Sequence, residues 1–190
     1  MSIRTAAAIA LATFAVAAPA ADQLPDPAQG YLCCNMRTDG KWISDSNYQE
    51  GGKHLIPAGT PVKAVDFGRQ RVYIEVNGGK QAIGNDYSRD LDMTTFAKRY
   101  IVAEDPTKKL ASASPKIREA VATARVMPGM TREQVLMSLG YPISSENPHL
   151  DAKLWRYWVT SFAEFQVLFE GDKVKSISAD ERTRNLVVME

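Results

Sequence analysis

The 190-residue sequence is poor in the residues that build most catalytic and metal sites, with two histidines and two cysteines. His54 and His149 lie far apart without matched partners, as solvated loop histidines do, and a metal needs three or four closely spaced ligands. Asp86, Asp90 and Asp92 could bind Ca²⁺ weakly. They lack the glycine and distal glutamate of a known calcium loop, so a charged turn is the simpler interpretation. We therefore expect no catalytic residue, no metal and no cofactor, and we expect that the chain is not an enzyme.

The sequence also lacks an excess of charge of either sign. It has 23 Lys and Arg against 22 Asp and Glu, and its net charge is +1. No basic block exceeds Lys108-Lys109, so the electrostatic footprint of a nucleic-acid-binding protein is missing. Hydrophobic residues make up 45% of the chain, an ordinary globular proportion that suits one domain or two small ones.

The first residues, MSIRTAAAIALATFAVAAPAAD, have the pattern of an export signal. One early charge, Arg4, precedes an apolar run over residues 6–18 and an A-x-A cleavage pattern. The run is shorter than the ~20 apolar residues of a membrane-spanning helix, although an uncleaved anchor or a buried helix is the alternative. We predict a signal peptide over residues 1–20, a periplasmic mature chain without a transmembrane helix, and a proline-rich linker over residues 21–30.

The two cysteines are adjacent. An acylated cysteine is preceded by small residues with a leucine three positions back, and neither Cys33 nor Cys34 has this pattern, so we expect no lipid anchor. Adjacent Cα atoms lie only ~3.8 Å apart, less than ordinary disulfide geometry requires. Three interpretations of Cys33 and Cys34 stay open: buried thiols in a strand, a vicinal disulfide, or bonds to another chain.

Residues 31–108 carry short strand patterns separated by turns. The clearest is RVYIEVNGGKQAIG, where apolar residues alternate up to the turn sequence Asn77-Gly78-Gly79 and a second strand returns. Strands of this length with turns between them favour a small all-β, barrel-like module.

Two helices and a strand meander are expected over residues 111–190. Ser114 precedes a helix that has proline at its first position. Thr131 and Gln134 form a capping-box pattern for the next helix, which Gly140 ends. Three strand patterns follow, and residues 185–189 could add a fourth. The expected fold class is therefore α+β, with the β module followed by a two-layer ααβββ domain that has an antiparallel meander.

Four pieces of this second region occur in an order that resembles the SmpA/OmlA (BamE-like) family of envelope proteins. They are GMTREQV at 129–135, LGYP at 139–142, WRY at 155–157 and FQVLF at 165–169. The resemblance implies an ααβββ fold in the periplasm that acts by protein contact. More loosely, LIPAGTPVKAVDFGRQRVYIEV resembles a bacterial Src-homology-3-type barrel.

The sequence thus predicts a non-catalytic cell-envelope protein that binds another envelope protein or complex, at the outer membrane or its assembly machinery. Strand alternation places Arg156 and Trp158 on the face opposite Trp155, and we expect these two residues to contact the partner. The alternative is that the N-terminal module or its linker covers Trp158. A periplasmic enzyme inhibitor, or an enzyme whose site cannot be read from the sequence, is the alternative.

Overall fold

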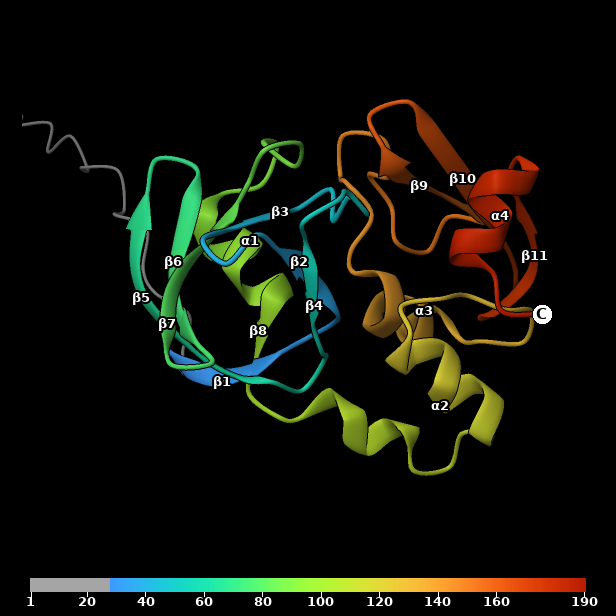
Figure 1. The fold of residues 1–190 in the computed structure, drawn as a ribbon, viewed down its shortest axis with the longest axis horizontal. Coiled ribbons are helices and arrows are strands. Elements are labelled where there is room, and N and C mark those ends of the chain that lie inside the picture. The colour runs from blue at the N-terminus through green and yellow to red at the C-terminus, as the bar shows by residue number, and fades with distance from the viewer. Residues whose placement is uncertain (1–27) are drawn as a thin grey trace, which may run out of the picture.

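The structure is a computed structural model that describes residues 28–190. The expected signal peptide at residues 1–20 and nearly all of the expected linker lie outside the described residues. The described chain is mostly β: it has an eight-stranded curled mixed sheet, a three-stranded sheet and four short α-helices (Figure 1). The expected fold class, a small barrel followed by a compact ααβββ domain, is therefore wrong.

The larger sheet is built from the N-terminal part of the described chain, residues 28–102, and has the strand order β4-β2-β3-β7-β6-β5-β1-β8. Its strands are β1 (Gln29–Leu32), β2 (Met36–Thr38), β3 (Trp42–Ser44), β4 (His54–Ile56), β5 (Pro61–Gly68), β6 (Arg71–Val76), β7 (Gly79–Gly84) and β8 (Ile101–Val102). β3 pairs with β7 in parallel, whereas the other neighbours are antiparallel. This one parallel pairing makes the sheet mixed, and it cannot be predicted from a local turn sequence because parallel strands are not joined by a tight turn.

The β6–β7 hairpin forms where the sequence predicts it. Asn77 and Gly78 have φ values of 51° and 75°, the left-handed conformations that a two-residue hairpin turn requires. Val72, Ile74 and Val76 point inward and are at most 2% exposed. The side chains between them face solvent, so the sheet buries one face.

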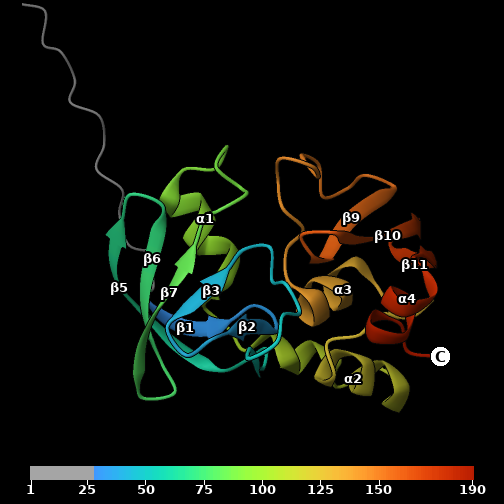
Figure 2. The ribbon, with the colours of Figure 1, turned by 45° about the horizontal axis from the view of Figure 1, so that its top comes forward.

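Helix α1 (Met93–Tyr100) lies within the curl of this sheet (Figures 1 and 2). Its N-cap is Asp92, whose side chain accepts a hydrogen bond from the Thr95 amide. Phe96 and Tyr100 are 0% and 2% exposed and complete the first hydrophobic core. The curled sheet and α1 therefore bury their apolar surfaces against each other.

The C-terminal part, residues 106–190, holds the smaller antiparallel sheet, which has the order β11-β10-β9, and a second core. Its elements are η1 (Pro106–Leu110, a 3₁₀ helix), α2 (Pro115–Ala122), α3 (Arg132–Leu139), β9 (Leu154–Thr160), β10 (Ala163–Glu170), β11 (Lys173–Ser178) and α4 (Glu181–Val187). None of the helices in residues 28–190 is long and apolar enough to cross a membrane.

The caps predicted for α2 and α3 are confirmed. The Ser114 side chain accepts from the Ile117 amide, and Thr131 and Gln134 form the reciprocal capping box. The fourth strand suggested at residues 185–189 is wrong, because Asp180 caps α4 and the helix extends to Val187. The chain becomes extended after Val187, and Val188 forms an isolated β-bridge with Val126.

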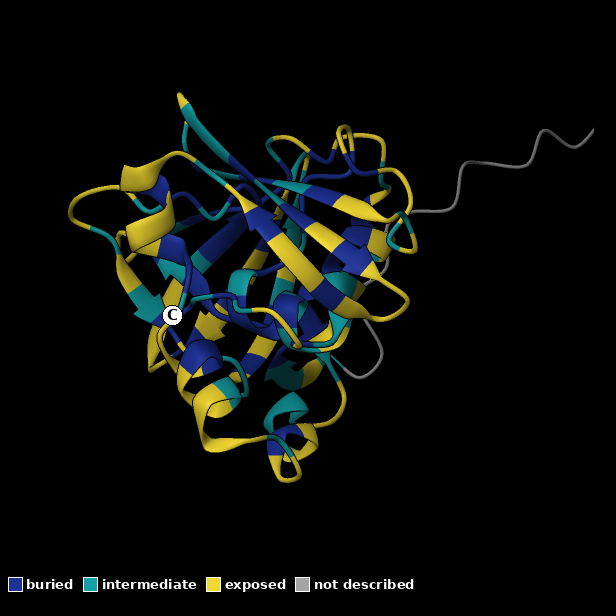
Figure 3. Cartoon of the chain, turned by 90° about the vertical axis from the view of Figure 1, so that its right-hand side faces the viewer, coloured by how far each residue is buried: buried dark blue, intermediate teal, exposed yellow. Residues whose placement is uncertain are grey.

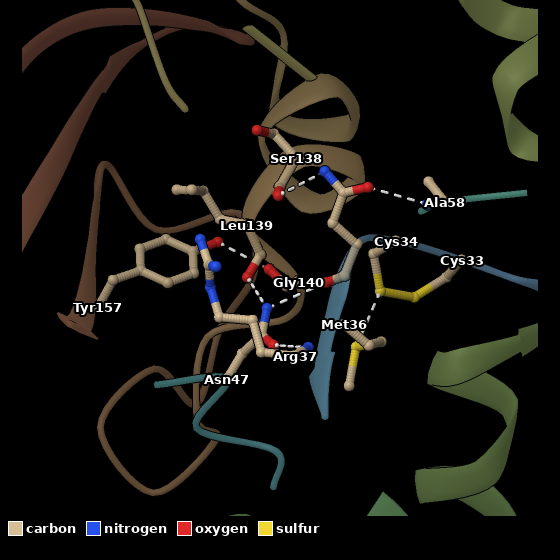
Figure 4. Close-up of a disulfide and its surroundings, with 11 residues drawn as sticks. Cys33, Cys34, Met36, Arg37, Asn47, Ala58, Ser138, Leu139, Gly140 and Tyr157 are labelled. Carbon is tan, nitrogen blue, oxygen red and sulfur yellow. Dashed lines mark hydrogen bonds between the residues drawn. A yellow bond between two sulfur atoms is a disulfide. The ribbon is translucent and has the colours of Figure 1, made fainter. Parts of the chain in front are cut away.

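A buried amide joins the two parts of the molecule. Asn35, which is 1% exposed, donates from its side chain to the carbonyl oxygens of Val121 and Ser138 and accepts from the Ala58 amide. Its own carbonyl accepts from the Asn47 side chain, which also donates to the Leu139 carbonyl at 2.9 Å (Figure 4). The ends of α2 and α3 are thereby bound to the strand region around β2.

Candidate interaction surface

The two faces of β9 have different surroundings, as the alternation in the sequence predicts. Trp155, Tyr157 and Val159 point into the second core and are at most 6% exposed. The intervening residues from Leu154 to Thr160 are half-buried or exposed. Figure 3 shows this alternation of buried and exposed residues along the strands of the smaller sheet. Only the outer face is thus available to another molecule.

Trp155 is the centre of the second core. Its ring is fully buried and meets Phe169 edge-on, with 4.6 Å between the centroids. The Arg132 guanidinium lies over both rings and donates to the carbonyl oxygens of Leu150 and Ala152. Arg132 therefore closes this end of the core by a cation–π contact and backbone hydrogen bonds, and Trp155 is structural.

Apolar side chains remain uncovered on the outer face. Leu154 and Leu168 are cross-strand partners in β9 and β10, and they are 42% and 36% exposed. Such pairs approach closely enough to form one continuous apolar patch. Single exposed leucines are ordinary on a protein surface, but a paired patch on an open sheet face is a candidate contact.

Arg156 and Trp158 occupy the middle of this face, as predicted, but both already have partners. Arg156 lies 3.4 Å from a carboxylate oxygen of Glu164 and 3.9 Å from one of Glu146. Trp158 is half-buried, and its Nε1 donates to Glu146 at 2.9 Å. It also borders a small hollow shared with Asn47 of the N-terminal part. These polar contacts hold Arg156 and Trp158 in place on the surface.

The most exposed aromatic is Phe162, which the sequence reasoning missed. It occupies the turn between β9 and β10 and is 97% exposed. The signal was present in the sequence, because the two strand patterns end at Thr160 and resume at Ala163, which leaves an aromatic residue in a tight turn. A phenylalanine that buries almost nothing contributes little to folding, so its apolar ring is free for a partner.

The N-terminal part supports this turn. The Tyr48 hydroxyl is hydrogen-bonded to Ser161, the residue before Phe162, and its ring lies 6.0 Å from that of Tyr87. Burial, together with the neighbouring Tyr87, raises the pKa of Tyr48 to about 12, so the hydroxyl is neutral and keeps its proton at physiological pH. We call the set Leu154, Arg156, Trp158, Phe162 and Leu168 the hairpin face.

The structure joins Cys33 and Cys34 by a vicinal disulfide, one of the three interpretations left open by the sequence (Figure 4). Both residues are buried, at 9% and 0% exposure, in the short connection between β1 and β2. The backbone is held on either side, since the Cys33 amide donates to the Tyr100 carbonyl and the Asn35 amide to the Met137 carbonyl.

The aspartates near residue 90 do not converge on one point. Asp86 accepts from Ser44, Asp90 from Ser144, and Asp92 caps α1. Within residues 28–190 no group of three or more His, Cys, Asp or Glu residues could hold a metal ion. The charged turn favoured from the sequence fits these contacts.

A further aspartate holds the same loop. Asp45 is 1% exposed and accepts hydrogen bonds from the backbone amides of Asp86, Tyr87 and Ser88. Burial raises the pKa of its carboxyl group, and the bonds to Ser88 and Tyr87 oppose that rise. Asp45 thus organises the loop as an acceptor for three amides.

Comparison with known proteins gives no relative. No protein-family model, no curated protein and no solved structure matches this chain.

Proposed function

We propose that this chain is a non-catalytic bacterial cell-envelope protein that acts by binding another envelope protein through the hairpin face. The observation that carries the proposal is Phe162, an aromatic side chain that is 97% exposed at the end of an open sheet face. Aromatic and arginine side chains are over-represented among the residues that dominate binding energy. The hairpin face combines them with the paired leucines Leu154 and Leu168.

The arrangement of this face supports protein contact rather than a solvated surface. The Arg156 and Trp158 side chains are fixed by Glu146 and Glu164, so little rotamer entropy remains to be lost on binding. Phe162 and the leucines lie toward opposite ends of the strand pair, with the polar groups between them. A partner would therefore make apolar contacts at both ends of the hairpin face and polar contacts at its centre.

The envelope location rests on the sequence. The export signal expected at residues 1–20 directs the chain to the periplasm, and the four motifs between residues 129 and 169 resemble those of an envelope family. We propose that the mature chain works at the outer membrane or its assembly machinery, without a lipid anchor.

The test is affinity capture from an envelope extract with immobilised protein. We expect one set of envelope proteins to be retained by the wild type and to be lost with Phe162→Ser, because truncating an aromatic residue that dominates an interface weakens binding by about 30-fold or more. Leu186→Ser is the matched control, since Leu186 lies on α4 and is 39% exposed. Equal retention by all three proteins would refute the proposal.

A further inference from the structure

A cavity of about 300 Å³ lies where the two parts of the molecule meet. Its wall comes from the β1–β2 connection, β8 and the segment after it, η1, α3 and Tyr141, which follows α3. The lining residues are Cys33, Val102, Glu104, Asp105, Pro106, Lys109, Glu133, Leu136, Met137 and Tyr141. The wall thus combines an apolar group of side chains with a charged group.

The charged group lies at the solvent side. The side chains of Lys109 and Glu133 form an ion pair and are 61% and 56% exposed. The apolar group includes Cys33 and Tyr141, which is half-buried. A small molecule that enters past the ion pair therefore reaches Cys33, one of the two residues of the disulfide.

The two cysteines are not equally accessible. Cys33 is 9% exposed and lines the cavity, whereas Cys34 is fully buried. The Cys34 sulfur instead lies 3.8 Å from the Met36 sulfur (Figure 4). Thiol–disulfide exchange needs a clear approach to the sulfur under attack, so Cys33 is the side from which the disulfide can be opened.

We propose that Cys33 is a thiol–disulfide exchange site that accepts small thiols and dithiols of the cell envelope through this cavity. An incoming thiolate attacks the Cys33 sulfur and forms a mixed disulfide. The Cys33–Cys34 bond breaks, its electron pair leaves on Cys34, and Cys34 takes up the proton that the reagent gave to solvent.

A dithiol completes the reduction. The second thiol of the reagent, as thiolate, attacks the reagent's first sulfur, which is bonded to Cys33 in the mixed disulfide. The Cys33 sulfur leaves and takes up a proton. The dithiol ends as a cyclic disulfide, and two electrons have passed from it to the cysteine pair. A monothiol stops at the mixed disulfide unless a second molecule repeats the attack.

The folded chain tolerates this opening. A bond between adjacent residues closes almost no loop, so its loss adds little conformational entropy to the unfolded chain. The hydrogen bonds from the Cys33 amide to Tyr100 and from the Asn35 amide to Met137 do not involve the sulfurs. Exchange therefore takes place in the native state and is reversible.

The charges of the cavity select among reagents. Glu104, Asp105 and Glu133 supply three carboxylates against the single ammonium group of Lys109. A reagent with a further negative charge is repelled, while one with a positive charge is attracted, and added salt weakens both effects. Thiols that carry an ammonium group should react faster than thiols that carry a sulfonate group.

The experiment compares cysteamine with mercaptoethanesulfonate on the full chain in its disulfide form. Each rate is divided by that reagent's rate with a small-molecule disulfide, which removes differences in intrinsic reactivity. Mass spectrometry after an acid quench identifies the modified cysteine. We expect the adduct on Cys33, and a corrected rate ratio on the order of tenfold in favour of cysteamine at low salt.

Variants separate the cavity from the rest of the surface. Glu133→Gln should lower the ratio, and Glu75→Gln, an exposed position on β6, should leave it unchanged. An adduct on Cys34, a reaction that occurs only in denaturant, or a ratio that Glu133→Gln does not alter would each overturn the proposal. None of these results depends on the hairpin face.

Discussion

The two sheets of this molecule differ in how completely they bury their apolar surfaces. The eight-stranded sheet curls around α1, so its inner face is enclosed and its outer face carries charged residues such as Lys63, Arg71 and Glu75 (Figure 2). The three-stranded sheet has too few strands to curl. Helices and loops cover one face, and the other face keeps Leu154 and Leu168 uncovered.

This difference favours the smaller sheet as the surface for the binding that we propose. A sheet that encloses its own core leaves an outer surface that needs no partner, whereas a short open sheet exposes apolar atoms that a partner can cover. The N-terminal part supports the C-terminal one, through Asn35 at the helix ends and Tyr48 beneath the turn that carries Phe162. The larger sheet thus acts as the scaffold, and the smaller sheet presents the hairpin face.

The largest expected effect comes from emptying either core. Trp155→Ala should lower the free energy of unfolding by about 3–5 kcal/mol, since the ring is fully buried and the cavity would not collapse. Phe96→Ala in the other core should cost a similar amount, which makes it the matched variant. Denaturant titration followed by circular dichroism measures both. A cost below ~1 kcal/mol at Trp155 would mean that the second core packs in another way.

The next effect concerns the junction. Asn35→Ala should cost roughly 1–3 kcal/mol, because the carbonyls of Val121 and Ser138 lose the Asn35 side-chain donor and the Ala58 amide loses its acceptor. Asn147→Ala is the control, as Asn147 is equally buried but bonds within the C-terminal part, to Ile143 and Arg156.

Hydrogen exchange distinguishes these two variants. Asn35→Ala should speed exchange at the β1–β2 connection and at the C-terminal end of α3, where the parts meet. Asn147→Ala should speed exchange near β9. The same exchange pattern in both variants would contradict a junction that depends on Asn35.

A smaller effect appears in the pH dependence, with opposite signs in the two parts. Hydrogen bonds from the Thr183 side chain and backbone lower the pKa of Asp180, the α4 cap. The stability that Asp180 adds to the fold is therefore present above pH 3.8, the ordinary pKa of the carboxyl group, and is lost as the pH falls. Burial raises the pKa of Asp45, so its contribution is greatest below 3.8 and is lost as pH rises through the raised pKa.

Melting temperatures from pH 2.5 to 7 test this contrast. The amount by which Asp180→Asn lowers the melting temperature should shrink as the pH is lowered below about 3.8. The amount by which Asp45→Asn lowers it should instead shrink as the pH is raised above 3.8. Parallel curves for the two variants would show that burial does not govern Asp45.

The smallest effect on stability is expected at the hairpin face itself. Phe162→Ser should change the free energy of unfolding by no more than about 0.5 kcal/mol, because the ring is 97% exposed. The melting temperature therefore serves as the control for every binding experiment with this variant. A steep loss of stability would mean that Phe162 is packed in solution.

Local signals in the sequence predicted the elements that local chemistry determines. The capping residues Ser114 and Thr131 marked α2 and α3, and Asn77-Gly78 marked the β6–β7 turn. The alternation along β9 correctly separated Trp155 from Arg156 and Trp158. Each of these depends on residues within a few positions of one another.

What the sequence did not predict depends on distant contacts. The parallel pairing of β3 with β7 brings together strands that share no turn, and it changes a small barrel into a curled mixed sheet. Residues 185–189 have a strand-like composition, but the Asp180 cap starts a helix that extends to Val187. Phe162 was overlooked because residues in turns fall outside both periodic patterns.

The most direct test of the proposed function is site-specific photo-crosslinking in intact cells. A photoreactive phenylalanine analogue at position 162 should yield a discrete adduct with another envelope protein, whereas the same analogue at position 186 on α4 should not. The adduct should disappear when Leu154 and Leu168 are both changed to serine. No adduct at position 162, or the same adducts at positions 162 and 186, would contradict binding through the hairpin face.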